Sequence, residues 1–167
     1  MVFLRFLNFF TFIFWYGTLL YFTLVQAPVL FKTLPRPFFG EVQSKLFPPY
    51  YLISYICGTL LVITYHLLHP LKNYVPQDCV RITALCLMLL FSLFQGLWIG
   101  PKVSSLRLER QAAEETYQKT NAPTDQDRIN ALSQEFGKAH GISSLINLAV
   151  ILSGLVYSIY WFKEIYP

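Results

Sequence analysis

Four long hydrophobic blocks, separated by polar stretches, organise the chain. Residues 6–31, 48–66, 82–100 and 139–162 contain no Lys, Arg, Asp or Glu. Each block is long enough for a helix to cross a hydrocarbon core of ~30 Å at ~1.5 Å per residue. The pattern predicts four membrane-spanning helices at about 6–31, 48–66, 82–100 and 140–162.

Polar positions in the fourth block recur with helical spacing. At 100° per residue, one narrow sector contains Phe136, His140, Ser144, Asn147, Ile151, Gly154 and Ser158. Lipid cannot satisfy imidazole or carboxamide groups, so we expect this stripe to face other spans or a water-filled cavity between them.

Composition agrees with a membrane protein. Only 13% of the residues are charged and the mean hydropathy is +0.44, whereas a soluble domain averages about 25% charged residues. The first block lacks an A-x-A cleavage pattern and is expected to remain as an anchor. We therefore predict an all-α integral membrane protein with one membrane domain, 1–167: a four-transmembrane-helix bundle with a long polar helical connection, 102–139, between spans three and four.

Prolines and small residues suggest how the spans begin and pack. Pro35 and Pro37 are expected to prevent a regular helix at the start of the first connection, 32–47, and Pro48 with Pro49 to begin the second span. Ser92, Gly96 and Gly100 repeat every four residues, a small-xxx-small pattern that lets a neighbouring helix approach closely. That neighbour is either another span or a second copy of the chain.

The connection 102–139 is expected to form two helices broken near Pro123, and the second, which is roughly in phase with span four, is compatible with an uninterrupted helix into that span. One interpretation is an amphipathic hairpin lying on the membrane surface or capping the bundle. The other is a lid or a docking element for a protein partner.

Basic residues are distributed unequally between the two sides of the predicted bundle. The first and third connections carry nine: Lys32, Arg36, Lys45, Lys102, Arg107, Arg110, Lys119, Arg128 and Lys138. The other side carries four: Arg5, Lys72, Arg81 and Lys163. The positive-inside rule therefore places 32–47 and 102–139 in the cytosol. The basic excess more plausibly meets lipid headgroups than nucleic acid, because no nucleic-acid motif accompanies it.

The helix directions bring several polar span ends into one half of the bilayer. The residues expected to converge there are Gln26, Tyr50, Ser54, Gln95, Trp98, His140, Ser144 and Asn147. They would form either a cavity for a small polar molecule, a lipid headgroup or a proton, or a hydrogen-bond network that holds the spans in register.

Enzymatic and metal chemistry find little support in the sequence. No span contains a carboxylate, and HExxH, Gly-rich phosphate loops and G-x-S-x-G are absent. A Ser144 nucleophile activated by His140 would lack an orienting acid. His66 and His69 read as headgroup-level side chains without a nearby carboxylate rather than metal ligands. We expect a non-enzymatic protein with no catalytic residues, cofactor or metal.

Two segments resemble a known family. One runs from Leu34 to Tyr50 and contains Pro35, Arg36, Phe39, Gly40 and the run Val42, Gln43, Ser44, Lys45, Leu46, Phe47, Pro48; the other contains His140, Gly141, Ser143, Ser144, Asn147 and Leu148. Both resemble the signature of the transmembrane protein 205 family, and Trp98, Pro101 and Lys102 match more loosely. Pro49 and the long connection depart from the family pattern.

The resemblance implies a four-span protein whose vertebrate relative is associated with cisplatin resistance. It also singles out Gln43 and Lys45 beside Tyr50, His140 and Asn147. Platinum prefers soft sulfur ligands, and the chain offers only three cysteines and two methionines, so direct coordination is not expected.

Two functions remain open from the sequence. The first is a multi-pass protein whose cavity near His140 binds or passes a small polar molecule or lipid headgroup. The second is a structural or adaptor protein whose 102–139 connection docks a partner. The endoplasmic reticulum, the mitochondrial outer membrane and the plasma membrane are all compatible with the sequence.

Overall fold

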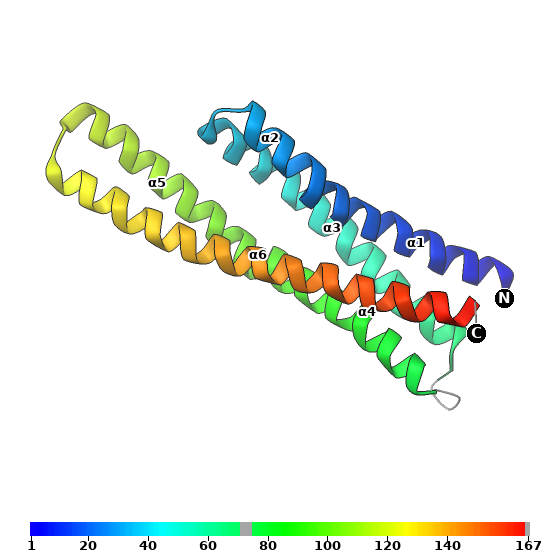
Figure 1. Ribbon diagram of the computed structural model, residues 1–167. Helices are drawn as coiled ribbons and strands as arrows, with labels where there is room; N and C mark the ends of the chain where they lie inside the picture. The colour runs from blue at the N-terminus through cyan, green and yellow to red at the C-terminus, as the bar shows by residue number, and fades with distance from the viewer. Residues whose placement is uncertain (71–74, 166–167) are drawn as a thin grey trace.

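Four helical rods make up the molecule (Figure 1). The computed structural model describes residues 1–70 and 75–165; Lys72, counted above among the basic residues, lies outside them. Strands do not occur in the described ranges. All four rods are long and apolar enough to cross a membrane. The predicted all-α four-helix membrane bundle is confirmed.

Two of the rods contain a short π-helical segment. The first comprises α1 (Val2–Tyr21), the π-helical η1 (Phe22–Gln26) and α2 (Ala27–Thr33), and the second is α3 (Arg36–Leu68). The third comprises α4 (Pro76–Phe94), the π-helical η3 (Gln95–Ile99) and α5 (Gly100–Thr120), and the fourth is α6 (Pro123–Ile165). Each predicted span lies inside one rod.

The core lies where α1, α3, α4 and α6 meet. Trp15, Leu61, Leu85 and Met88 have no exposed surface, and Tyr157 is almost fully buried beside them. α1 packs along α3 and α4 along α6, while the contact of α3 with α4 joins these two pairs. Because lipid is as apolar as this core, close packing and interhelical hydrogen bonds rather than hydrophobicity hold the rods together.

The start of the second rod differs from the prediction. α3 begins at Arg36, with Pro35 at its cap and Pro37 in its first turn, and it continues through Pro48 and Pro49. Pro37 is tolerated because an N–H in the first turn has no intrahelical partner. Pro48 and Pro49 lie on an exposed side of the helix, so their rings displace no packed neighbour. The first connection is therefore largely helical. The expectations that Pro35 and Pro37 prevent a regular helix there, and that Pro48 and Pro49 occupy a first helical turn, were wrong.

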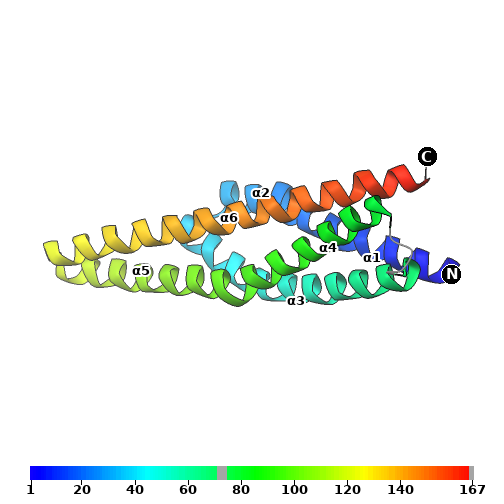
Figure 2. The same cartoon turned by 90° about the horizontal axis from the view of Figure 1, so that it is seen from below.

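The polar connection extends the bundle lengthwise. α5 continues the third rod, and α6 runs unbroken from the hairpin turn through span four. Asn121, in the left-handed conformation (φ 50°), ends α5 at that turn. Figures 1 and 2 show α5 and α6 side by side, projecting past the ends of α2 and α3. The hairpin neither lies across the bundle nor caps it, so that interpretation was wrong.

The small-residue pattern packs within the chain. A Cβ atom on Gly96 would lie 1.9 Å from the Tyr55 hydroxyl oxygen and 2.8 Å from Cγ of Tyr51, and one on Gly100 would lie 3.3 Å from the Tyr51 ring. Both tyrosines belong to α3. The glycines therefore let α3 approach η3, which makes the neighbouring helix a span of the same chain.

Candidate functional site

Two π-helical turns lie at corresponding places in the first and third rods. The N–H of Ala27 bonds to the Phe22 carbonyl, five residues earlier, and the N–H of Gly100 bonds likewise to the Gln95 carbonyl. A proline, Pro28 or Pro101, follows each of these donors directly. Proline has no N–H to continue the α-helical ladder, and a widened turn is one way for the helix to accommodate it. Such π-bulges are frequent at functional sites.

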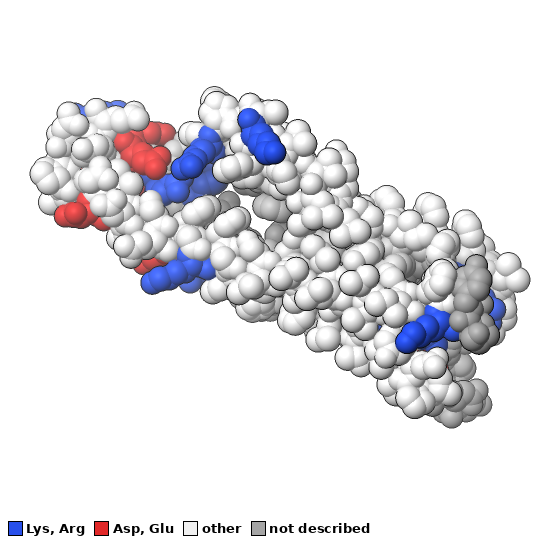
Figure 3. Space-filling model, viewed as in Figure 1, with Lys and Arg blue, Asp and Glu red and all other residues white. Residues whose placement is uncertain are grey.

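A cavity of about 510 Å³ lies beside these two turns. It is bounded by η1 and α2, by the first half of α3, by the end of α4 with η3, and by α6. Its walls are mainly apolar and include Phe22, Phe39, Phe47 and Val150. Figure 3 shows the surface hollowed in this region, between the α5–α6 hairpin and the α2–α3 end, with Lys and Arg side chains around it.

A polar band crosses the cavity at the level of the π-helical turns. The Gln26 amide donates to the Gln43 side-chain oxygen (3.1 Å), the Gln95 amide donates to the Ser143 hydroxyl, and the Asn147 amide donates to the Thr23 hydroxyl (2.9 Å). These bonds link span one to span two, span three to span four, and span one to span four. The band therefore ties together all four rods.

Two acceptors in this band remain unused. The side-chain carbonyl oxygens of Gln26 and Gln95 are buried and accept no hydrogen bond from any described residue. A buried acceptor without a partner costs about 1–3 kcal/mol. A molecule that donates hydrogen bonds at this site would recover that free energy.

The structure brings together most of the residues that the sequence singled out. Gln43, Tyr50, Gln95, His140, Ser144 and Asn147 line the cavity. Gln26 joins them through its bond to Gln43.

Three predicted residues do not line the cavity. Lys45 is exposed and forms an ion pair with Glu41 (2.6 Å) on its own helix. Trp98 is 61% exposed, and Ser54 is completely buried, donating to the Tyr50 carbonyl (2.9 Å). The prediction placed Trp98 and Ser54 by helix end alone, and Lys45 was added by the family resemblance; all three side chains lie on faces other than that of the cavity.

The polar stripe of α6 faces the bundle along only part of its length. Gly154 is buried against the Tyr16 ring, and the Tyr16 hydroxyl donates to the Ile151 carbonyl (3.0 Å). His140 and Ser144, nearer the hairpin, line the cavity but are exposed. Asn147 still reaches span one.

The proposed pairing of Ser144 with His140 is not formed. The Ser144 hydroxyl donates to the His140 backbone carbonyl (2.9 Å), and the imidazole stacks on Phe136, with ring centroids 5.8 Å apart. The hydroxyl therefore has no contact with the imidazole that would activate it as a nucleophile.

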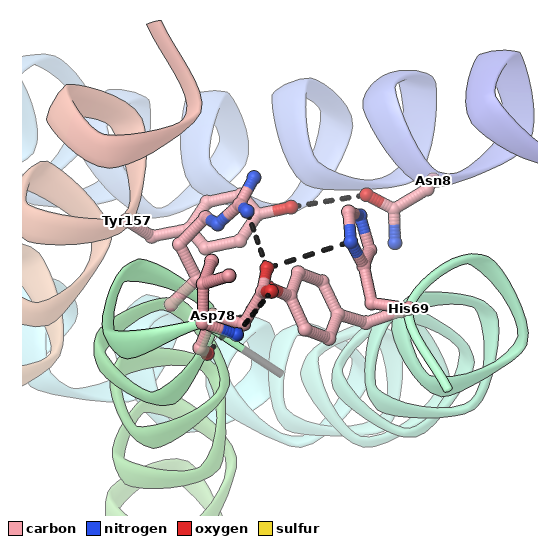
Figure 4. Close-up of polar contacts among 7 residues, drawn as sticks. Asn8, His69, Asp78 and Tyr157 are labelled. Atoms are coloured by element: carbon pink, nitrogen blue, oxygen red, sulfur yellow. Dashed lines mark hydrogen bonds and ion pairs between the residues drawn. The ribbon is translucent and has the colours of Figure 1, made fainter. Parts of the chain in front are cut away.

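The sequence reasoning missed a second polar cluster at the opposite end of the bundle (Figure 4). Asp78 accepts hydrogen bonds from the Tyr65 hydroxyl (2.8 Å) and the Val75 N–H (3.1 Å), pairs with Arg81, and lies 3.4 Å from Nδ1 of His69. The expectation that no carboxylate lies near this histidine was wrong. Asp78 and Arg81, at i and i+3 where span three begins, were the available signal.

A second set of bonds in this cluster ties three spans together. The Tyr157 hydroxyl donates to the Asn8 side-chain oxygen (3.0 Å), and the Asn8 amide donates to the Thr64 hydroxyl (2.7 Å). Burial lowers the pKa of His69 below its ordinary value near 6.5, so the ring is neutral at pH 7. Among the described residues, no group of three or more His, Cys, Asp or Glu is placed to hold a metal ion.

Residues 10–112 match the family model described as "Domain of unknown function (DUF4149)". The chain belongs to this family. No solved structure matches the chain.

The DUF4149 segment covers most of the first three rods, including η1, η3 and the residues Gln26, Gln43 and Gln95. α6 lies beyond it. Family membership and four spanning helices make this a multi-pass membrane protein of a family without assigned function.

Proposed function

We propose that this DUF4149 protein is non-enzymatic and that its cavity beside η1 and η3 binds or passes a small polar molecule or a lipid headgroup. The observation that carries this proposal is the pair of buried, unused acceptors on Gln26 and Gln95 beside a cavity of about 510 Å³. Ligand cavities have volumes of about 300–1,000 Å³ and combine apolar walls with a few polar groups.

The cavity's chemistry suggests the class of molecule. Amide oxygens accept hydrogen bonds, so hydroxyl, amide or ammonium donors suit them. Phe22, Phe39 and Phe47 provide apolar surface for an attached hydrocarbon portion. His140 and Ser144 line the cavity, but the Ser144 hydroxyl donates to the His140 carbonyl and the imidazole stacks on Phe136. No Asp, Glu or Cys lines the cavity to orient the imidazole or to act as a nucleophile, which favours binding over nucleophilic chemistry.

Filling the cavity tests this function. Ser144→Phe places a ring at the cavity mouth without burying a new polar group, because Ser144 lines the cavity and bonds only to its own helix. Leu145→Phe is the matched control, since Leu145 is exposed on the outer side of α6. We expect native mass spectrometry of protein extracted in mild detergent to show a bound small molecule in the control and in wild type.

The Ser144→Phe protein should remain folded but no longer carry that molecule. The proposal would be contradicted if the Ser144→Phe and Leu145→Phe proteins carried the molecule equally, or if the wild type carried none.

A second candidate function is that of an adaptor. It is favoured by the projection of the α5–α6 hairpin past α2 and α3 (Figure 1). Most of the charged side chains of this hairpin are exposed. Deleting 102–134 removes most of the hairpin and leaves every residue that lines the cavity. Full retention of cellular activity after this deletion would exclude the adaptor role.

The resemblance to the transmembrane protein 205 family adds a proposed link to cisplatin resistance. Cys57 is buried, Cys79 is exposed and Cys86 is half-buried, and all three are free thiols on separate parts of the bundle. If the protein acts without coordinating platinum directly, its cysteines are not needed for protection from cisplatin. We then expect cells with the triple variant Cys57→Ala, Cys79→Ser, Cys86→Ala to be protected as well as cells with the wild type. Loss of protection at equal expression would point to thiol coordination.

We also propose that the hairpin and the 32–47 connection face the cytosol. The excess of Lys and Arg at that end of the bundle supports this orientation. Protease digestion of sealed vesicles should cleave the turn near Asn121 from the cytosolic side only, and cleavage from the other side would reverse the assignment.

A further inference from the structure

A second cavity, of about 350 Å³, lies at the end of the bundle that carries both chain termini. Its lining includes Arg5, Asn8, His69, Arg81, Tyr157 and Trp161. His69 follows the last turn of α3, whereas the first cavity uses residues from the first half of α3. The two cavities therefore lie toward opposite membrane surfaces.

Arg81 is a buried cation held in a fixed position. It is only 4% exposed, pairs with Asp78, and lies over the Tyr65 ring at 5.6 Å. Asp78 is itself fixed by the Tyr65 hydroxyl and the Val75 N–H. A buried charge is stable only when it is paired in this way. The pair orients the Arg81 guanidinium at the cavity wall; Figure 4 shows Asp78 at the centre of these contacts.

The charges around this cavity do not cancel. Arg5 is exposed where it lines the cavity, and Arg81 forms part of its wall. Asp78 supplies one carboxylate beside them, and His69 is neutral at pH 7. Among the described residues that form this site, one positive charge remains in excess. The charges of these described residues together favour an anion.

We propose that this cavity binds a phosphate group, with Arg5 and Arg81 as its cationic contacts. Guanidinium groups match the oxygens of phosphate geometrically and bind them strongly. The site lies at the ends of the rods, at the level of lipid headgroups, and Trp161, stacked on Phe9 (4.7 Å between ring centroids), is an aromatic residue of the kind enriched there. The phosphate comes either from a lipid headgroup or from a free anion.

The test uses the full chain in dodecyl maltoside, a detergent without phosphate. Melting temperature is followed while phosphatidylglycerol is added, with diacylglycerol as the control that lacks the phosphate. A second titration adds inorganic phosphate, with chloride at equal ionic strength as its control. A higher melting temperature with phosphatidylglycerol but not with inorganic phosphate identifies a site for a lipid headgroup. A higher melting temperature with both identifies a site for phosphate in general.

Two single variants separate a specific site from diffuse attraction. Arg5→Ala should weaken the binding of the active probe about tenfold, the loss expected for a hydrogen bond to a charged group. Lys163→Ala removes a charge at the same end of the bundle but outside the cavity lining, and should bind as wild type does. Equal weakening in both variants, or no rise in wild type with either phosphate probe, overturns the proposal.

A double variant tests Arg81. Arg81→Ala alone would leave the Asp78 carboxylate buried without its cation and risks misfolding. Asp78→Asn combined with Arg81→Gln removes both charges together and keeps polar groups in place. This variant should fold and lose phosphate binding, and binding retained at wild-type strength overturns the role of Arg81.

Discussion

Individual polar residues in this bundle serve two different purposes. Asn8 and Asn147 use their amide groups to join spans, as in a packing network. Gln26 and Gln95 join spans with the amide nitrogen but leave the oxygen unused. The sequence singled out Gln26, Gln95 and Asn147 because polar side chains are rare in lipid, yet it could not show which atoms stay unpaired.

Gln95→Leu separates the two purposes. The substitution loses the bond to Ser143, worth about 1 kcal/mol in a membrane protein, and removes a buried acceptor that has no partner. We therefore expect the free energy of unfolding to change by less than about 1 kcal/mol, while the molecule retained in the cavity is lost. Asn147→Leu, which removes the linking bond to Thr23 at another point of the cavity lining and no unused acceptor, is the comparison.

Denaturant titration and native mass spectrometry of both leucine variants measure these effects. A loss of several kcal/mol for Gln95→Leu, with the bound molecule unaffected, would make Gln95 a packing residue.

Helices were predictable as elements, but their faces were not. Uncharged length alone locates the four spans, because each must cover the hydrocarbon core. How deeply each residue of α6 is buried depends on tertiary fit, and the π-helical turns η1 and η3 accommodate Pro28 and Pro101. These prolines are visible in the sequence, but α3 contains Pro48 and Pro49 without a π-helical turn, so a proline alone does not predict one.

Gly96→Ala tests the contact between α3 and η3. The new methyl group would meet Cγ of Tyr51 at 2.8 Å, and this atom lies next to the backbone, so either χ1 of Tyr51 must change or the helices must separate. We expect a loss of about 1–3 kcal/mol, the usual cost of overpacking, seen as a lower melting temperature. A Cβ atom at Gly141 would have no other atom within 4 Å, so Gly141→Ala should leave the melting temperature unchanged or raise it. Similar melting temperatures for the two variants would contradict the packing account.

The whole molecule is a bundle with two cavities, each lined in part by polar residues, on either side of a closely packed centre formed by residues such as Trp15, Leu61 and Met88. The first polar region was predicted because its residues lie near span ends that share a half of the bilayer. The second was missed because Asp78 and Arg81 were treated as connection residues, and only the fold brings them to Tyr65 and His69.

This second region should make stability depend on pH. Burial lowers the pKa of His69, so the unfolded chain binds a proton more readily than the native one. The free energy of unfolding is therefore constant at pH values above the ordinary histidine pKa near 6.5. It decreases as the pH falls below that pKa, by at most about 1.4 kcal/mol per pH unit. Melting temperatures between pH 8 and pH 5 measure this loss, and His69→Gln should reduce it. An unchanged slope in that variant would assign the effect to other groups.

The uninterrupted course of α6 has a mechanical consequence. At ~1.5 Å per residue, its 43 residues form a rod of about 65 Å, more than twice the hydrocarbon thickness. A force applied at the tip of the hairpin would tilt the whole of α6 as one rigid helix, because the helix has no break between the hairpin and the first cavity. The tilt would therefore displace the residues at the cavity mouth. A pair of glycines introduced beside Gly137 would provide such a break and uncouple the two ends.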